Sequence, residues 1–373
     1  MESKIVIGVD ASRSNVLQKT GTEYYSYEII SRMVLSEKDN FRLYSKTPLQ
    51  YIKNKPNIQT KVMRFPKLWS QFRLSFEIIN HPPSVLFEPA HTIPIFHGKK
   101  TVVTLHDVGF KYFPELYTPL ERFYHNFSMS FSIKHATKII AISQNTKNDL
   151  VKLYNADPKK ITIIYHGYDT EKYRPLEPKE VVPPEIAKLG KYIYFIGRLE
   201  AKKNIVNLIK AYGVLRQNAK IDHKLILAGR PGYEFENISQ EIEKLPANIK
   251  KDVIMPGYIL DELAPMYLRA ADLFAWPTYF EGFGMPLVEA MACNVPIVAS
   301  NTTSTPEVLG NAGLMCDPND YNTFASNMQK VILEPKLRLD LIEKGRSRLH
   351  LFNWQNATKQ TLDVIRSAIN SPK

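Results

Sequence analysis

The chain has 373 residues, of which 44% are hydrophobic and 23% are charged, values that fit a globular protein with two domains. Its net charge of +12 favours anionic partners, but no zinc-finger, homeodomain or RNP-type signature accompanies that charge, so we expect no nucleic-acid partner. Two cysteines, no apolar run of roughly 20 residues and no apolar signal-peptide core argue against a disulfide-rich, membrane-spanning or secreted protein and favour a cytoplasmic one.

In the first half of the chain, short β-branched runs alternate with helical segments. Helices are predicted at 23–35 and 122–136, and strands at 4–9, 41–44, 61–64, 84–88, 101–105, 138–142 and 161–165. This alternation predicts an α/β fold with a parallel, doubly wound sheet. Ligands of such sheets bind beyond the carboxyl ends of the strands, so the residues after each strand are the candidates for function.

Two segments after these strands carry candidate residues. Thr20 and Glu23 fit a capping box at a helix start, and Gly21 between them would let a ligand oxygen approach the backbone. A plain helix cap explains the same residues. His106, in Thr104-Leu-His-Asp107, follows a central strand, where a ligand contact and a purely structural role are both open.

Residues 67–76, Lys-Leu-Trp-Ser-Gln-Phe-Arg-Leu-Ser-Phe, mix basic and large apolar side chains. A helix that lies in a membrane interface has this composition. An amphipathic helix that packs on the core is the alternative. The basic residues elsewhere are dispersed and suit either a solvated surface or an anionic membrane surface.

A segment rich in proline and charge, residues 174–184, interrupts the pattern and predicts a linker over 176–190. The alternation then resumes, with a helix at 204–215 and strands at 192–196, 224–228, 253–255, 272–276 and 297–299. We therefore expect two Rossmann-like domains, 1–175 and 191–353, followed by a helical segment at 354–373.

Two cations follow the first strand of the second half. Arg198 lies just past the strand end and Lys203 just before the next helix, where a positive charge opposes the helix dipole. An anion between them and the helix would remove that conflict, and a guanidinium with a nearby ammonium suits a diphosphate. Exposed basic residues in a loop are the alternative.

The segment Phe280-Glu-Gly-Phe-Gly-Met-Pro-Leu-Val-Glu-Ala places two acids, Glu281 and Glu289, eight positions apart. The preceding strand, the two glycines and Pro286, placed at the first helical position, predict a helix start whose free N–H groups form an anion site. A carboxylate before that site and another within it suit a sugar nucleotide. Acids that only complement the helix dipole are the simpler alternative.

No Asp-x-Asp triplet occurs in the chain, so no carboxylate pair is evident for a divalent cation on a diphosphate. Arg198, Lys203 and helix N-termini would then neutralise the leaving group. The sequence therefore predicts a metal-independent reaction without a cofactor.

These residues resemble the retaining GT-B glycosyltransferases of the large group 1 family, glycosyltransferase family four. That family includes sucrose-phosphate synthase, glycogen synthase-like enzymes and bacterial polysaccharide mannosyltransferases. The match covers nearly the whole chain and is most specific in Gly197-Arg-Leu-x-x-x-Lys203-Asn and Glu281-Gly-Phe-Gly-x-Pro-x-x-Glu289. His106-Asp107 and Thr305-Pro-Glu-Val308 support it, and the residues around Thr20 and His106 look most like the mannosyltransferase branch.

The resemblance implies a GT-B fold with two domains facing a central cleft, an acceptor domain first and a donor domain second, and a C-terminal helix that crosses back to the first. It also implies roles for individual residues: Glu281 and His106 in catalysis, Glu289 on the ribose, Gly257 and Tyr258 at the base, Gly282, Phe283 and Gly284 at the donor sugar, and Arg198, Lys203, Gly21, Thr22, Met285 and Leu287 at the diphosphate. Many relatives have two adjacent glycines where this chain has Gly21-Thr22, which puts the contact of Thr22 in doubt.

The function that follows is retaining transfer of a hexose, foremost mannose from GDP-mannose, to a glycan or lipid-linked acceptor in cell-surface polysaccharide synthesis. A UDP-glucose or UDP-N-acetylglucosamine transferase, a sugar-nucleotide epimerase and a catalytically silent partner subunit are the alternatives. We expect a monomer or weak dimer, peripheral at the inner face of an anionic membrane.

Overall fold

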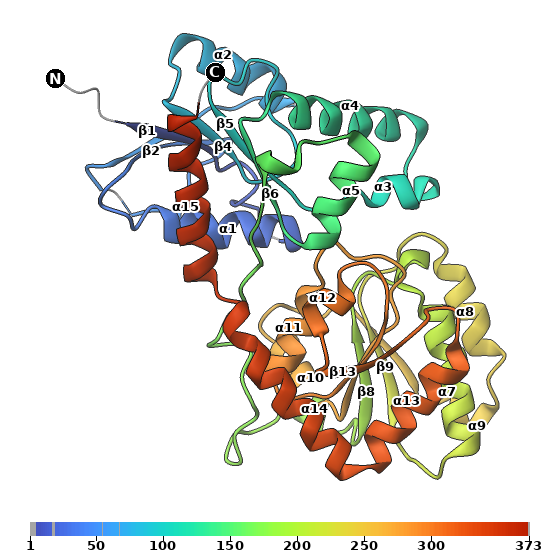
Figure 1. Cartoon of the computed structure of the whole chain (residues 1–373). Helices are drawn as coiled ribbons and strands as arrows, with labels where there is room; N and C mark the ends of the chain where they lie inside the picture. Colours follow the sequence, from blue (N-terminus) through green and yellow to red (C-terminus); the bar gives the residue numbers. More distant parts are fainter. Residues whose placement is uncertain (1–4, 17–18, 54, 67, 372–373) are drawn as a thin grey trace. The chain divides into compact units, whose positions relative to one another are not determined.

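The structure is a computed structural model that describes residues 5–16, 19–53, 55–66 and 68–371 (Figure 1). The chain forms two compact units. The first combines Met1–Gly167 with Asn353–Lys373, and the second is Tyr168–Phe352, which includes the residues 176–190 predicted as a linker. Each unit is built on one parallel sheet, so the predicted pair of Rossmann-like domains is confirmed.

The first unit contains a seven-stranded sheet in the order β3-β2-β1-β4-β5-β6-β7, with every neighbouring pair parallel. The strands are β1 (Val6–Asp10), β2 (Asn40–Ser45), β3 (Ile58–Val62), β4 (Val85–Glu88), β5 (Thr101–Leu105), β6 (Lys138–Ala141) and β7 (Ile161–Ile163). The third strand, predicted at 61–64, begins earlier at Ile58, because its register with β2 pairs Ile58 with Phe41.

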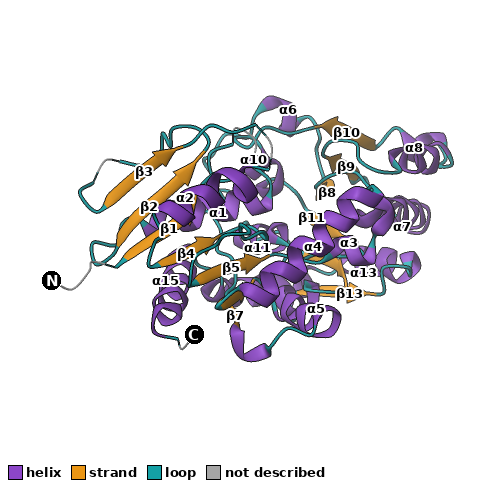
Figure 2. Ribbon diagram, turned by 90° about the horizontal axis from the view of Figure 1, so that it is seen from above, coloured by secondary structure: helices purple, strands orange, loops and turns teal. Residues whose placement is uncertain are grey.

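The second unit contains a six-stranded parallel sheet in the order β10-β9-β8-β11-β12-β13 (Figure 2). The strands are β8 (Tyr192–Ile196), β9 (Lys224–Ala228), β10 (Val253–Gly257), β11 (Leu273–Trp276), β12 (Ile297–Ser300) and β13 (Gly313–Cys316). The sequence prediction missed β13. This edge strand starts with a glycine and is only partly buried over its first three residues, so it lacks a strong apolar signal.

Helices connect the strands in both units (Figure 1). Those of the first unit are α1 (Gly21–Met33), α2 (Ser75–Asn80), α3 (Gly109–Tyr112), α4 (Pro119–His135), α5 (Gln144–Tyr154) and α15 (Trp354–Asn370). Those of the second are α6 (Pro184–Ala187), α7 (Ile205–Asn218), α8 (Phe235–Glu243), α9 (Ala247–Lys250), α10 (Ala264–Arg269), α11 (Met285–Ala292), α12 (Thr305–Leu309), α13 (Tyr321–Leu333) and α14 (Pro335–Arg348). No helix in the described ranges has the length and apolar character needed to cross a bilayer.

The C-terminal helix α15 belongs to the first unit, where it packs against α1 and against β4, β5 and β6. Its apolar face is buried, with Ile365 and Ala368 fully inaccessible to solvent. On the other side, the Arg366 guanidinium contacts the Asp39 carboxylate at 2.7 Å. Residues from the two ends of the chain therefore build one core.

The two segments that connect the units touch each other. A Cβ atom added at Gly167 would lie 2.2 Å from the backbone nitrogen of Trp354, a distance that no side chain tolerates. The indole ring of Trp354 also stacks on His166, with ring centroids 5.5 Å apart. Glycine at 167 is thus required by the close approach of the returning chain.

Candidate functional site

The strand order of each sheet reverses at one point. In the first unit the reversal falls between β1 and β4, and in the second between β8 and β11. At such a point the loops leave in opposite directions from the carboxyl ends of adjacent strands and open a ligand crevice. In the second unit these loops are residues 197–204 and 277–284, the same two segments that the sequence singled out.

Lys203 and Glu281, which are far apart in the sequence, form an ion pair at this point. The Lys203 Nζ atom lies 2.5 Å from Glu281 Oε1, and only 14% and 13% of the two side chains are exposed. The Lys203 ammonium also lies over the ring of Trp276, 5.2 Å from its centroid. A charge-assisted hydrogen bond in such a sheltered place holds both side chains firmly.

The backbone around each partner is fixed by hydrogen bonds. Before α7, Asn204 adopts a left-handed conformation, and its side-chain amide donates to the carbonyls of Pro277 at 3.0 Å and Pro318 at 2.7 Å. The Tyr279 amide donates to the Lys202 carbonyl at 3.0 Å. The loops after β8 and β11 are therefore joined to each other, which sets the position of Lys203.

Sequence reasoning missed Thr303 and Ser304 as supports of Glu281. The Glu281 amide donates to Thr303 Oγ1 at 3.0 Å, and Ser304 Oγ donates to the Glu281 carbonyl at 3.0 Å. Thr303 adopts a left-handed conformation with φ of 51°. Their place directly after β12, at the carboxyl edge of the sheet, is the signal that would have found them.

Helix α11 starts next to this pair. Its N-cap is Gly284, with φ of +90°, and a Cβ atom there would lie 3.1 Å from Leu287 Cδ1. The helix begins at Met285, so Pro286 occupies the second helical position and not the predicted first; its missing N–H costs nothing there for the same reason. The Leu287 amide donates to the Gly284 carbonyl at 3.0 Å.

Two aromatic residues line the start of α11 from inside. Phe283 is buried and packs edge-on against Phe352, with ring centroids 5.8 Å apart, while the preceding Gly282 is partly exposed. The indole nitrogen of Trp276 is buried without a hydrogen-bond partner among the described residues. It lies 3.7 Å from the Cβ position built at Gly284, so a further N–H donor sits beside the helix start.

Glu289 lies one turn inside α11 and is partly buried. Burial raises the pKa of its carboxyl group to about 7, helped by the negative charges of Asp169 and Asp261 and opposed by a hydrogen bond from Tyr173. The free protein therefore holds this carboxyl group close to half ionised at neutral pH.

Arg198 is not drawn into the pair. Its side chain is 66% exposed, and its Nε atom lies 3.6 Å from Glu200 Oε2. Gly232 lies beneath it, since a Cβ atom built there would be 2.9 Å from Arg198 Nε. An exposed arginine next to the strand-order reversal can reorient toward an anion at low cost.

Gly257 ends the edge strand β10 and Tyr258 follows it, away from the reversal point. The Arg230 guanidinium lies 4.5 Å from the centroid of the Tyr258 ring, and the Tyr258 hydroxyl donates to Asp261 at 3.0 Å. Tyr258 and Arg230 thus form an aromatic and cationic surface at the edge of the sheet.

In the first unit, His106 follows β5 and is buried. Its Nε2 atom donates to the Pro89 carbonyl at 2.8 Å, and its ring packs edge-on against Tyr25 at 4.8 Å between centroids. Burial lowers the pKa of His106. The ring is therefore neutral at pH 7, with the proton on Nε2, and Nδ1 is an acceptor.

Gly21 and Thr22 occupy the first two positions of α1 in the first unit, and the capping box is confirmed, since the Thr20 amide donates to Glu23 Oε2 at 3.2 Å. A Cβ atom built at Gly21 meets nothing within 4 Å. The helix start is therefore open to a ligand.

A buried acid pair at the reversal point of the first sheet also escaped the sequence prediction. Glu88 ends β4 and Asp10 ends β1, and both are buried. Burial raises the pKa of both carboxyl groups, that of Glu88 further because of the adjacent Asp10. An acid at the end of an otherwise apolar strand is the signal that would have indicated it.

No group of three or more His, Cys, Asp or Glu residues in the described part of the chain is arranged to hold a metal ion. The cysteines do not contribute, because Cys293 and Cys316 are both buried free thiols.

Comparison with known families matches both halves of the chain. Residues 178–348 match the model of Glycosyl transferases group 1, and residues 25–172 match that of Glycosyltransferase Family 4. The two models together extend over most of both structural units.

Individual relatives agree with these matches. The chain is 28% identical to O-antigen chain mannosyltransferase B of Escherichia coli, over 93% of this chain and 96% of that protein. Its fold resembles sucrose-phosphate synthase from Thermosynechococcus elongatus, with a TM-score of 0.75, 17% identity and coverage of 99% and 100% of the two chains. It also resembles Anabaena HepE in complex with UDP-glucose, with a TM-score of 0.72, 17% identity and coverage of 98% and 100%.

Proposed function

Since the chain belongs to the Glycosyl transferases group 1 family and has the GT-B fold, we propose that it transfers mannose from GDP-mannose to a glycan or lipid-linked acceptor with retention of configuration. The chain is a glycosyltransferase, and its similarity to an O-antigen mannosyltransferase over nearly the full length of both chains supports polysaccharide synthesis. The UDP-glucose complex of HepE keeps a UDP-sugar donor as the second candidate.

The observation that carries this proposal is the Lys203–Glu281 ion pair at the reversal point of the second sheet, beside the start of α11. A donor diphosphate would replace the Glu281 carboxylate as the partner of Lys203. The same exchange would free Glu281 to accept hydrogen bonds from the donor sugar. Binding of the leaving group and release of the catalytic carboxylate are thereby coupled.

Charge on the departing diphosphate would be neutralised by Lys203, by Arg198 and by the N–H groups at the start of α11, and these groups would take the place of a metal ion. The reacting sugar gains positive charge as the bond to the leaving group lengthens. The acceptor hydroxyl attacks the same face, within an ion pair stabilised by Glu281, as the bond from the sugar to the diphosphate breaks, and the hydroxyl proton passes to the departing diphosphate oxygen. His106, neutral because its pKa is lowered, would contact the sugar without repelling that charge.

Glu289 is assigned to the ribose hydroxyls, which an ionised carboxylate accepts best. Because the pKa of Glu289 is raised to about 7, donor affinity is expected to fall about tenfold between pH 8 and about pH 6. Calorimetric titration of the donor at both pH values measures this. The Glu289→Gln variant should bind more weakly at pH 8 and lose most of the pH dependence; an identical dependence in both proteins would contradict the assignment.

The Glu289 carboxyl group also makes the free energy of unfolding depend on pH. A carboxyl pKa above that of the unfolded chain stabilises the protonated folded state, so this contribution is present at low pH and lost as pH rises through about 7. As pH rises from about 5 to about 8, the free energy of unfolding of Glu289→Gln should therefore increase by about 1–2 kcal/mol relative to that of wild type. Urea unfolding at both pH values checks this, with Glu236→Gln on α8 as the control. A gain that does not vary with pH would exclude ionisation of Glu289 as its cause.

The donor is tested by thermal shift, because a ligand that binds only the folded state raises the melting temperature. GDP-mannose should stabilise the protein more than UDP-glucose, UDP-N-acetylglucosamine or ADP-glucose. Preference for a UDP-sugar would transfer the proposal to the second candidate. Conversion of the donor to an epimer without transfer would exclude both.

We place the enzyme at the inner face of the membrane as a peripheral monomer or weak dimer. An acceptor built on a lipid carrier would be presented there, and the net charge of +12 favours an anionic surface.

A further inference from the structure

Helix α2 and the π-helical turn before it, Ser70–Leu74, are apolar on two sides. Leu74 and Ile78 face the core and are buried beside Trp69. Phe72 and Phe76, one turn apart, point to solvent, and Phe76 is 64% exposed. An ordinary surface helix keeps polar residues on that side.

Helix α4 repeats the pattern. Its inner face contributes Met129 and Ile133 to the core. Its outer face carries Leu120, Phe123 and Phe127 at helical spacing, with Leu120 77% and Phe123 70% exposed. In this helix, too, large apolar side chains occupy the positions where charged residues are usual.

The loop after β4 joins these two helices into one surface. The Ile95 amide donates to Gln71 Oε1 at 3.1 Å and the Phe96 amide to Ser75 Oγ at 3.3 Å, which ties the loop to the α2 side. The Ile93 amide donates to Ser132 Oγ on α4 at 3.2 Å. Figure 1 draws α2 and α4 along the same side of the first unit.

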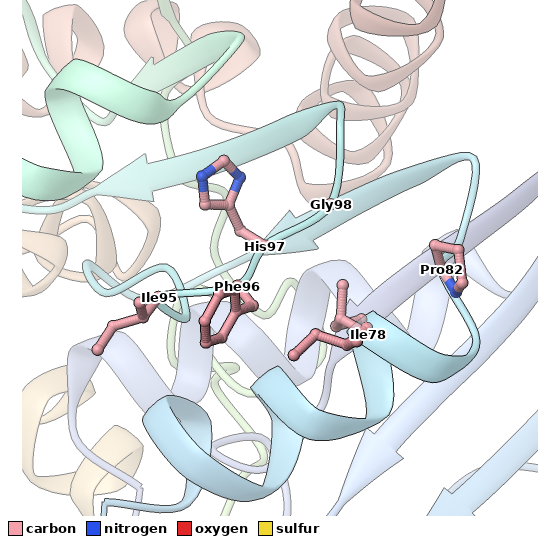
Figure 3. Close-up of a pocket in the computed structure, with 7 residues that line it drawn as sticks. Ile78, Pro82, Ile95, Phe96, His97 and Gly98 are labelled. Atoms are coloured by element: carbon pink, nitrogen blue, oxygen red, sulfur yellow. The ribbon is translucent and has the colours of Figure 1, made fainter.

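The side chains of this loop extend the exposed apolar surface. Ile95 and Phe96 are both exposed. Together with Pro82 and Ile78 they border a hollow of about 360 Å³ between the loop and α2. Figure 3 shows Phe96 on the loop side and Ile78 on the helix side of this hollow. We call the exposed apolar side chains of 72–79, 95–96 and 120–127 the aromatic face.

The charge beside the α2 and loop parts of the aromatic face is positive, whereas the α4 part carries both the exposed acid Glu121 and the cation Arg122. Residues 42–105 contain ten lysines and arginines but only two acids, Glu77 and Glu88, and both acids are buried. Lys46 and Arg64, with Phe65 and Pro66, line a shallow pocket of about 390 Å³. Few acids are therefore present to balance the cations in this part of the surface.

We propose that the aromatic face docks on a bilayer that contains anionic lipid, with its phenylalanines at the acyl boundary and Lys46 and Arg64 at lipid phosphates. Contiguous aromatic exposure with a cationic margin is the combination that holds a protein in the membrane interface. A second copy is a poor occupant, because it would bring two positively charged surfaces together. The proposal rests on the membrane location given above but not on the identity of the donor. Lys67 of the predicted interfacial segment lies outside the described residues.

Vesicle sedimentation without donor tests the apolar part. The protein should bind vesicles of phosphatidylcholine with about 30% phosphatidylglycerol, and bind pure phosphatidylcholine at least about tenfold more weakly. The triple variant Phe72→Ser, Phe76→Ser, Phe123→Ser should lose about tenfold or more in affinity for the anionic vesicles. Leu333→Ser with Leu339→Ser, which alters exposed leucines of the second unit, should bind like wild type.

A charge pair of variants tests the cationic part. Lys46→Glu with Arg64→Glu should weaken binding by about fivefold or more per site, whereas Lys336→Glu on α14 should change it far less. Stabilisation of each variant by GDP is measured in parallel. Unaltered GDP stabilisation with reduced vesicle binding supports the docking surface.

Three results would overturn the docking surface. The first is no binding of wild type to anionic vesicles, and the second is equal binding by wild type and the triple variant. The third is a dimer of wild type, measured by light scattering, that becomes a monomer in the triple variant. If neither GDP nor UDP stabilises the wild-type protein while vesicle binding is intact, the result would instead count against the proposed transfer function. The two proposals therefore fail by different measurements.

Discussion

Replacement of Glu281 by glutamine is expected to lower kcat for sugar transfer by about 10²–10³-fold, because the variant removes the negative charge that stabilises the reacting sugar. The substitution preserves volume, and the hydrogen bonds of Thr303 and Ser304 involve only the Glu281 backbone, so the loop should keep its shape. Initial rates of transfer from GDP-mannose under saturating donor measure the effect.

Binding of GDP should survive this substitution, because the nucleotide contacts are assigned to other residues. Thermal stabilisation by GDP within about a factor of three in Kd of wild type would separate a catalytic defect from misfolding. Glu236→Gln, an exposed acid on α8, is the control and should transfer normally. Turnover of Glu281→Gln close to that of wild type would remove Glu281 from the reacting centre.

Replacement of Lys203 by alanine should weaken donor binding by about 1.5–3 kcal/mol, the value of a charged hydrogen bond to the diphosphate. The lysine is held in place by Glu281 and Trp276 before the donor arrives, so little side-chain entropy remains to be lost on binding. Calorimetry with GDP, and with GMP, which lacks the diphosphate, measures the loss. The effect should be large for GDP and small for GMP.

The neighbouring lysine provides a matched control. Lys202 lies 3.9 Å from Glu200, an acid to which the proposed reaction assigns no role, so Lys202→Ala should leave GDP affinity nearly unchanged. A double-mutant cycle of Lys203→Ala and Glu281→Gln isolates the pair itself. If both lysine variants bind GDP equally well, the diphosphate role of Lys203 is wrong.

Much of the fold could be predicted from the sequence, because buried parallel strands are continuous apolar runs. Twelve of the strands were predicted from short runs of apolar and β-branched residues, β11 and β12 among the most clearly, since all their residues are buried. The prediction failed where burial is weak. Strand β3 is mostly exposed and was placed too late, and β13 at the sheet edge was missed.

The individual residues of the site were predicted, but the ion pair between two of them was not. Lys203 and Glu281 were identified from their places near strand ends, yet nothing local to either residue indicates that the two form an ion pair. Thr303 and Glu88 were missed because each acts through a partner from a distant segment. Such contacts depend on the order of strands in the sheet, which the local pattern does not specify.

The contact between Gly167 and Trp354 determines how the two units can be separated. The second unit is an insertion into the first, and the chain enters and leaves it at two points that already touch. Excision of 168–352 would therefore leave ends that can be joined directly, whereas a fragment that stops at Gly167 would lack the helix that covers β4, β5 and β6. The first unit should therefore be produced by an internal deletion of 168–352 and not by truncation after Gly167.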